Sequence, residues 1–269
     1  MRNVVASVLC LISLSGCGTI PSEPSSAARS QLAPTGSLRI GVAFAPNPSP
    51  AFAVVDAGQD PRGVPVTIGR ELAKVAGVPS SIKLARNSGE LTELLAANEI
   101  DVSFFPMDET RKQRVDFGPD YFIFESTFLI RAGVSVRTMA ELDQPRLRVI
   151  GISNTDNFRA ASNFLKRNTV SPVTTVGEAV EMIRSGQADA FAFSRHGLTP
   201  ITATLPGSVV LKDSFLRSSV AIAIPKGRPD ALSFVSRFME IAKSNGFIKR
   251  AFVDVGLGDL DVAPPSSQK

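Results

Sequence analysis

The sequence predicts an α/β fold of two lobes, each with a mainly parallel sheet flanked by helices. Between residues 38 and 106, short apolar runs alternate with helical patterns in the order β-α-β-α-β. This order is typical of parallel strands joined by crossover helices. The same order starts again after residue 131. We therefore expect residues 38–131 and 225–260 to form lobe 1, residues 132–224 to form lobe 2, and the chain to cross between them twice.

In lobe 1, the clearest helical pattern belongs to Ile68, Leu72 and Val75, whose spacing places them on one face of a helix. A second helix, capped by Ser88, is expected before the strand that begins at Ile100. The other expected elements of this lobe are strands at residues 38–44, 82–84 and 122–131 and a helix at residues 67–76.

In lobe 2, threonines mark the expected helix starts. Thr138 and Thr175 are each followed three residues later by Glu, which is the capping-box pattern. Thr155 or Asp156 is expected to cap a third helix, and a long helix at residues 230–245 is expected to return to lobe 1. The expected strands lie at residues 148–152, 173–174, 188–193, 209–211 and 220–224.

The stretch that begins at Ile100 combines a strand, a polar loop and a cation. Val102 and Phe104 alternate with polar residues, which predicts a strand with one buried face. Pro106 ends the strand's hydrogen bonding because it has no N–H group. Polar residues beyond a strand end are where α/β sheets bind ligands, so we expect the loop that carries Arg111 to face a ligand.

The first residues have the pattern of a bacterial lipoprotein signal. A short basic start precedes an apolar run that is shorter than the roughly twenty residues of a membrane-spanning helix. Leu-Ser-Gly-Cys then ends at Cys17, so we expect residues 1–16 to be a signal peptide and Cys17 to carry lipid; an ordinary signal peptide with a chance Cys is the alternative. Residues 17–37, rich in Ser, Pro and Ala, are expected to be a flexible tether, and residues 261–269 a disordered tail.

Composition excludes several classes of function. A formal charge of +4 over 269 residues is too small to indicate a nucleic-acid-binding protein. His196 is the one histidine and Cys10 and Cys17 are the two cysteines, so we expect no metal site built from several such ligands. His196 itself is expected on a surface loop. The sequence contains no catalytic motif and no phosphate-binding glycine loop, so we expect neither an enzyme nor a cofactor.

Several segments, in the same order, resemble one protein family. They are LRIGV, RELAKVAGV, DETRKQRVDFGPDYF, MAELDQPRLRVIGIS, SGQADAFAF and VAIAIPKGRPDAL. Over about residues 38–257 the chain is similar to the family 3 extracellular solute-binding proteins, the amino-acid-type receptors of ABC importers. The resemblance implies a type II periplasmic-binding-protein-like clamshell with its ligand between the lobes.

The resemblance also implies ligand contacts. In that family, the arginine that matches Arg111 forms a bidentate pair with the ligand's α-carboxylate, and Thr110 stands beside it here. Asn154 and Thr155 match the helix start of the second lobe, which contacts the ligand. Ser194 stands where the family commonly has an Asp that pairs with the ligand's α-amino group, so that counter-charge is missing from this sequence.

Phe44 and Phe52 follow the first strand and are expected to form walls of the site. Several site residues have an alternative interpretation: Arg111 as a surface or lobe-structural arginine, Asn154 and Thr155 as a simple helix cap, and the two phenylalanines as core or loop packing.

We therefore expect a substrate-binding lipoprotein of an ABC importer, which captures a small polar, carboxylate-bearing solute and delivers it to a membrane permease. The expected partners are that solute, the permease subunits and the lipid bilayer through acylated Cys17, with no nucleic acid. The expected location is the periplasmic or extracytoplasmic face of a membrane. The alternatives are a sensory or adaptor lipoprotein with a solute-binding-like domain, and an inactive structural lipoprotein with an empty cleft.

Overall fold

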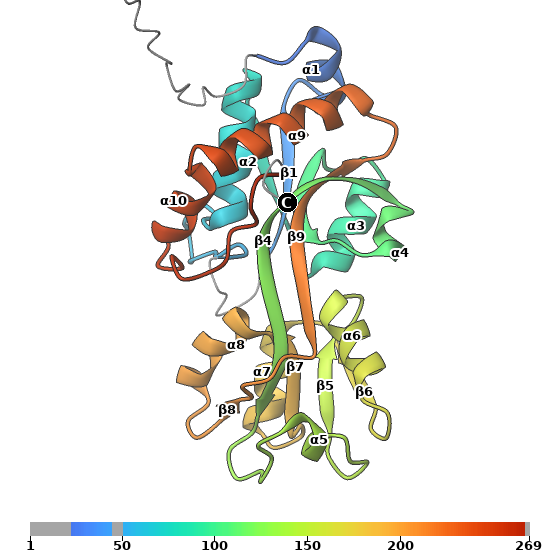
Figure 1. Ribbon diagram of the computed structural model, residues 1–269, viewed down its shortest axis with the longest axis vertical. Helices are drawn as coiled ribbons and strands as arrows, with labels where there is room; N and C mark the ends of the chain where they lie inside the picture. Colours follow the sequence, from blue (N-terminus) through green and yellow to red (C-terminus); the bar gives the residue numbers. More distant parts are fainter. Residues whose placement is uncertain (1–22, 45–50, 267–269) are drawn as a thin grey trace, which may run out of the picture.

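The computed structural model of the chain describes residues 23–44 and 51–266. Two lobes lie one above the other along the longest axis, and strands β4 (Val115–Ile130) and β9 (Leu216–Pro225) run side by side from one lobe to the other (Figure 1). The expected signal peptide, the lipidation site at Cys17 and the last residues of the expected tail lie outside the described residues.

Lobe 1, the upper lobe in Figure 1, is built on a sheet with the strand order β2-β1-β3-β9-β4. β1 is parallel to β2 and β3, whereas β9 is antiparallel to both of its neighbours. Besides β4 and β9, the elements of this lobe are α1 (Ser26–Leu32), β1 (Leu38–Ala43), α2 (Val64–Ala76), β2 (Ser80–Ala85), α3 (Ser88–Ala96), β3 (Val102–Pro106), α4 (Glu109–Lys112), α9 (Pro229–Ser244) and α10 (Phe247–Val253).

Lobe 2 continues the sheet in the order β4-β7-β5-β6, with β8 paired to β4. β7 is antiparallel to β4 and parallel to β5, and β5 is parallel to β6. Its elements are α5 (Met139–Leu142), β5 (Val149–Ile152), α6 (Asp156–Phe164), β6 (Val170–Val173), α7 (Val176–Arg184), β7 (Ala190–Ser194), α8 (Arg195–Ile201), the 3-10 helix η1 (Thr202–Thr204) and β8 (Val209–Val210).

The chain crosses between the lobes within β4 and β9 themselves. β4 pairs with β9 as far as Ser126 and with β7 from Ser126 onward, and β9 pairs with β3 from Val220. The expected crossing points near residues 131 and 225 are therefore wrong, because these positions lie at the outer ends of the two strands. A continuous strand can pair with one lobe at one end and with the other lobe at the other, so the sequence contains no break at the boundary.

Alternating side chains give each sheet two packed faces. In lobe 1, Val102 and Phe104 pack with α2, α9 and α10 on one face, while Phe105 packs with Leu91 and Leu95 of α3 on the other. In lobe 2, residues of α7 and α8 cover one face and residues of α5 and α6 cover the other. Helices cover both faces of the sheet in each lobe, so a ligand can reach the sheet only at the ends of its strands.

A buried aspartate joins two neighbouring strands in the same way in both lobes. Asp101, just before β3, accepts hydrogen bonds from the backbone N–H and Nε of Arg39 in β1, at 3.1 and 2.8 Å. Asp189, just before β7, accepts the same two bonds from Arg148, just before β5, at 3.0 and 3.0 Å. Because a buried carboxylate is costly unless it is paired, these contacts fix the relative position of the central parallel strands.

The expected flexible tether is wrong for residues 26–32. Ser25 caps α1, and Ala28 and Leu32 are buried where α1 packs on α9. The side-chain oxygen of Gln31 accepts a hydrogen bond from an N–H group in the first turn of α9, at 2.9 Å. The segment was assigned as a tether because most of its residues are polar or small. Ala28 and Leu32, however, are four positions apart, a spacing that gives a helix one buried face.

The expected disordered tail is also wrong for its described part, residues 261–266. Val262 forms a β-bridge with Phe122. Ala263 is buried, and its N–H donates to the carbonyl oxygen of Tyr121 at 3.0 Å. The tail packs because the long strand β4 offers it hydrogen-bonding groups. The sequence of the tail alone does not indicate that it pairs with this distant strand.

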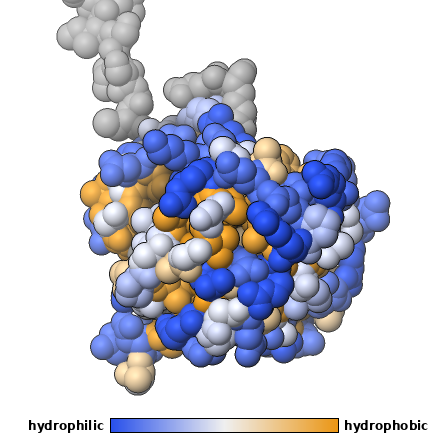
Figure 2. Space-filling view, turned by 90° about the horizontal axis from the view of Figure 1, so that it is seen from below, coloured by the Kyte–Doolittle hydropathy of each residue, from blue (hydrophilic) through white to orange (hydrophobic). Residues whose placement is uncertain are grey.

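The outer surface of lobe 2 is mostly polar. Seen from below, hydrophilic residues surround a smaller hydrophobic area (Figure 2). Among the described residues of lobe 2, Phe164 at 40% and Val209 at 41% are large hydrophobic side chains that remain exposed. No helix in the described part of the chain is both long enough and apolar enough to cross a membrane.

Replacing Leu32 by Ala tests whether residues 26–32 belong to the folded lobe. Leu32 is 1% exposed, so Leu32→Ala should lower the free energy of unfolding by about 2–5 kcal/mol, measured in urea. The control is Ser30→Ala, an exposed change in the same helix, which should have little effect. Equal stability of the two variants would mean that this segment does not pack on α9.

Candidate functional site

A small cavity lies between the lobes, at the carboxyl ends of β1, β3, β5 and β7. Its volume is about 60 Å³. Both lobes and the crossing strand β4 contribute to its lining, whose aromatic members are Phe44, Phe52, Phe104, Phe105, Phe124 and Phe193. Since α/β sheets bind ligands beyond the carboxyl ends of their strands, this cavity is the candidate binding site.

The polar residues on the cavity wall come from the helix starts that meet there: Arg86, Asn87, Ser88, Thr155, Asp156 and Asn157. Most are already engaged within the protein. Asn87 caps α3 by accepting from the N–H of Glu90 at 3.0 Å. Asn157 Oδ1 accepts from the hydroxyl of Ser126 at 2.6 Å. The engaged polar groups and the phenylalanine rings together make the cavity largely apolar.

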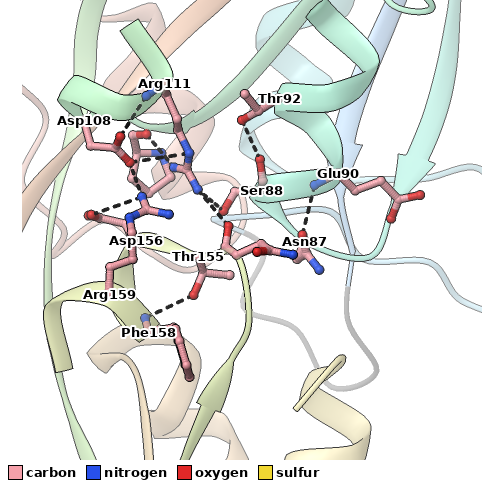
Figure 3. Close-up of polar contacts among 12 residues, drawn as sticks. Asn87, Ser88, Glu90, Thr92, Asp108, Arg111, Thr155, Asp156, Phe158 and Arg159 are labelled. Carbon is pink, nitrogen blue, oxygen red and sulfur yellow. Dashed lines mark hydrogen bonds and ion pairs between the residues drawn. The ribbon is translucent and has the colours of Figure 1, made fainter. Parts of the chain in front are cut away.

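Arg111 lies where the two lobes meet, beside this cavity. Asp108 caps α4, and its Oδ1 accepts from the backbone N–H of Arg111 at 2.9 Å. The arginine side chain is directed back toward the end of β3, where Nη1 donates to the carbonyl oxygen of Pro106 at 2.7 Å. Nη2 donates to Ser88 Oγ at 2.8 Å in lobe 1 and to the carbonyl oxygen of Asn154 at 3.3 Å in lobe 2 (Figure 3). We call these five residues the Arg111 junction.

A carboxylate of the chain itself, that of Asp108, lies beside the guanidinium group of Arg111. Arg111 Nε lies 3.5 Å from Asp108 Oδ2, and Arg159 of α6 rises from lobe 2 to pair with the same carboxylate (Figure 3). Burial lowers the pKa of Arg111 to about 10, and the negative charge of Asp108 opposes that shift. Arg111 therefore stays protonated at neutral pH, with protein oxygens as its partners.

The two lobes also approach closely at Gly89. A Cβ atom added to Gly89 would lie 2.6 Å from Cβ and 2.7 Å from the carbonyl oxygen of Asn154, across the lobe boundary. Asn154 itself has a left-handed backbone, with φ of 60°, which Asn adopts more readily than most residues. A glycine at position 89 is therefore needed for the turn before α6 to reach the start of α3.

The structure divides the predicted site residues into three groups. Phe44, Phe52 and Thr155 line the cavity. Thr110, Arg111 and Asn154 line a separate, open groove next to it. Ser194 is fully buried at the end of β7, its hydroxyl has no hydrogen-bond partner, and it is not among the described residues that line the cavity.

Thr155 also serves as the cap of α6. Its hydroxyl donates to the carbonyl oxygen of Ile152 at 2.7 Å and accepts from the N–H of Phe158 at 3.2 Å. The hydrogen bonds of Thr155 therefore agree with its interpretation as a helix cap. The residue also forms part of the cavity wall.

Sequence analysis missed four phenylalanines and one carboxylate of the wall. Phe104, Phe105, Phe124 and Phe193 all belong to strands, and alternating apolar residues in strands are normally assigned to the core. Their positions at or near strand ends were a usable signal. Asp156 was considered as a helix cap only, although it also lines the cavity; its side chain is directed toward Arg159 (Figure 3).

His196 lies in an aromatic environment, so the expected surface-loop position is wrong. Its ring centroid lies 5.2 Å from those of Phe52 and Phe122 and 6.0 Å from that of Phe124, and Nε2 has no hydrogen-bond partner. Burial lowers its pKa to about 3, so the ring is neutral near pH 7. Within the described residues, no group of three or more His, Cys, Asp or Glu side chains could hold a metal ion.

A model of the bacterial extracellular solute-binding proteins, family 3, matches residues 40–253 of the chain. The match covers most of the sequence and confirms the family resemblance predicted from its segments. Among curated protein sequences, no significant match is found.

Solved structures share this fold. A mutant of ArgBP from T. maritima has a TM-score of 0.75 at 22% identity, covering 85% of this chain and 99% of that one. A binding component of an ABC transporter from Wolinella succinogenes, complexed with lysine, has a TM-score of 0.73 at 26% identity, covering 82% and 95%. A solute receptor for L-cysteine of Neisseria gonorrhoeae has a TM-score of 0.75 at 21% identity, covering 86% and 93%. These likenesses confirm the predicted two-lobe fold.

The buried His196 predicts a pH dependence of stability. The unfolded chain binds a proton below a pKa of 6.5, whereas the folded protein does so only below about 3. The free energy of unfolding should therefore fall as the pH falls through this window, by about 2 kcal/mol between pH 7 and pH 5. Urea unfolding at the two pH values measures it.

The matched variant is His196→Phe, which keeps an aromatic ring in the same environment and removes the titrating group. It should lose most of the pH dependence in this window, where carboxylates with ordinary pKa values contribute little. A variant that still loses as much stability as the natural chain would show that His196 is not the group responsible.

Proposed function

Because the chain belongs to the bacterial extracellular solute-binding proteins of family 3, we propose that it captures a small solute in the cavity between its lobes. The observation that carries this proposal is the position of the cavity. It is walled by strand ends and helix starts from both lobes, so a solute there contacts both. A solute that binds the closed arrangement more tightly than the open one favours closure by that difference in affinity.

The closed protein would then deliver its solute to a membrane permease of an ABC importer, on the periplasmic or extracytoplasmic side. Support comes from the family and from the similar Wolinella succinogenes structure, which is a binding component of an ABC transporter. Lysine in that structure and L-cysteine for the Neisseria gonorrhoeae receptor favour an amino acid or a related small molecule as the starting point for a ligand search.

The carboxylate clamp predicted for Arg111 stays a prediction. In the Arg111 junction, Nη1 and Nη2 donate to Pro106, Ser88 and Asn154, and Nε faces the carboxylate of Asp108. A ligand carboxylate would have to replace some of these partners. The geometry gives more support to the interpretation of Arg111 as an arginine that holds the lobes together.

A binding role without catalysis is part of the proposal. His196, which a nucleophilic mechanism would need as its base, is packed among phenylalanine rings, and its Nε2 has no hydrogen-bond partner. A general base must lie within hydrogen-bond reach of the group that it deprotonates, and no such pair exists around this ring in the described residues.

We further propose that Cys17 carries the lipid anchor. Its support is the sequence pattern of a basic start, an apolar run and Leu-Ser-Gly-Cys. Helix α1 begins at Ser26, so only a short segment separates the proposed anchor from the folded lobe. The protein would therefore sit close to the membrane surface.

Filling the cavity tests the binding proposal. A set of amino acids, organic acids and amines is screened for solutes that raise the stability of the protein, and a solute at about 100 times its Kd should add about 2.7 kcal/mol. Ala43→Leu adds volume on the wall of the small cavity and should abolish this stabilisation. The control is Ala97→Leu at an exposed position. Unchanged affinity in Ala43→Leu would place the solute elsewhere.

Replacing Cys17 tests the anchor. Cys17→Ser should move the protein from the detergent-extracted membrane fraction to the aqueous fraction, because the thiol that would carry the lipid is gone. Cys10→Ser, a matched change within the expected signal peptide, should leave the distribution unchanged. Continued detergent-dependent extraction of Cys17→Ser would contradict lipidation at this residue.

A further inference from the structure

Ser88 links Arg111 to the cavity. It is the first residue of α3 and belongs to the cavity wall. Its Oγ atom accepts a hydrogen bond from Arg111 Nη2 at 2.8 Å (Figure 3). Arg111 itself is not among the described residues that line the cavity. A solute in the cavity therefore contacts Ser88, and the guanidinium group lies behind the serine hydroxyl.

The hydroxyl of Ser88 still has a hydrogen to donate. A serine hydroxyl has one O–H donor and two acceptor lone pairs. Arg111 occupies one lone pair of Oγ, and within the described residues no group accepts a hydrogen bond from this O–H. Because hydrogen bonds in a chain polarise one another, a hydroxyl whose oxygen accepts from a cation is a stronger donor. The positive charge of Arg111 is thus carried to a donor on the wall.

A second donor comes from the preceding residue. Asn87 also lines the cavity, and its Oδ1 atom accepts from the backbone N–H of Glu90 at 3.0 Å. Its side-chain NH₂ group remains, and this group has no acceptor in the described part of the chain. Two donors on neighbouring residues match the two oxygen atoms of a carboxylate, which only accepts hydrogen bonds.

Asp156, the carboxylate on the same wall, already has partners. It forms a hydrogen bond with Ser218 and lies 3.8 Å from Arg159. Asp156 belongs to lobe 2, whereas Ser88 belongs to lobe 1. A negative group of a solute is therefore favoured on the lobe 1 side of the cavity, where the charge of Arg111 reaches the wall through Ser88.

We propose that Ser88 selects the carboxylate of the solute by donating its O–H to one carboxylate oxygen, while Asn87 donates to the other. Arg111 acts as a positioning residue, which polarises Ser88 and does not touch the solute. The inference rests on the proposed function, because it concerns the same cavity. It gives the carboxylate a partner without breaking the bonds of the Arg111 junction.

The size of the cavity decides the choice of probes. Its volume is about 60 Å³, and the open groove next to it has a volume of about 520 Å³. Arg86 and Asn87 line both spaces. Small carboxylates are therefore the first probes, and a larger solute with its carboxylate at Ser88 would extend toward the groove.

The test uses calorimetry on the purified full-length protein. The probes are acetate, glycine and the other proteinogenic amino acids, each compared with the matching carboxamide, such as acetamide or glycinamide. At least one acid should bind, and its carboxamide should bind at least about tenfold more weakly. The reason is that a hydrogen bond to a charged acceptor is stronger than one to a neutral acceptor.

The variant Ser88→Ala removes the hydroxyl group. It should weaken binding of the acid at least about tenfold and change binding of the carboxamide much less, so the preference for the acid is largely lost. Ser88→Thr keeps a hydroxyl group and should restore the preference. A purely structural role of Ser88 would weaken the acid and the carboxamide equally.

The matched control is Ser81→Ala. Ser81 is an exposed serine in β2, near the end of the strand that is far from the cavity. This variant should keep the full preference for the acid over its carboxamide.

The outcomes separate the two proposals. An undiminished preference in Ser88→Ala, an equal loss of acid and carboxamide, or a loss that Ser88→Thr does not reverse overturns the inference, while the proposed solute-binding function stands. Equal binding of an acid and its carboxamide by the natural chain also overturns the inference alone. A protein that binds none of these probes contradicts both proposals.

Discussion

The guanidinium group of Arg111 lies buried between the two lobes, with oxygen atoms of both lobes around it. A buried charge is tolerated only where partners replace the water that it loses. Here Pro106, Ser88 and Asp108 of lobe 1 and the carbonyl oxygen of Asn154 of lobe 2 take that place. The relative position of the lobes, and therefore the cavity beside them, depends on this set of contacts.

This constraint gives the cavity its chemistry. When the chain supplies its own carboxylate to the arginine, the space at the strand ends is left to phenylalanine rings and to Asp156. The phenylalanine rings lose contact with water when the lobes meet, which favours closure. A solute adds to this only through contacts that differ between the open and closed arrangements. Arg111 therefore holds the two lobes together, and the residues of the cavity wall contact the solute.

The sequence was sufficient for the repeated β-α-β order, because periodic apolar residues report which faces are buried. It failed where a distant partner decides the outcome. Residues 26–32 form a helix that packs on α9, and residues 261–266 pair with β4. At the site, the sequence indicated the loop of Arg111 but not its hydrogen-bond partners. Asn154 is 43 residues away along the chain, and no local pattern connects the two.

The most direct test of this account is a crystal structure of the protein with the solute that it binds. The account predicts density for the solute among the phenylalanine rings of the cavity, with Arg111 Nη2 still bonded to Ser88 and to the carbonyl oxygen of Asn154. A solute carboxylate seated on the guanidinium group of Arg111, with those bonds broken, would contradict it.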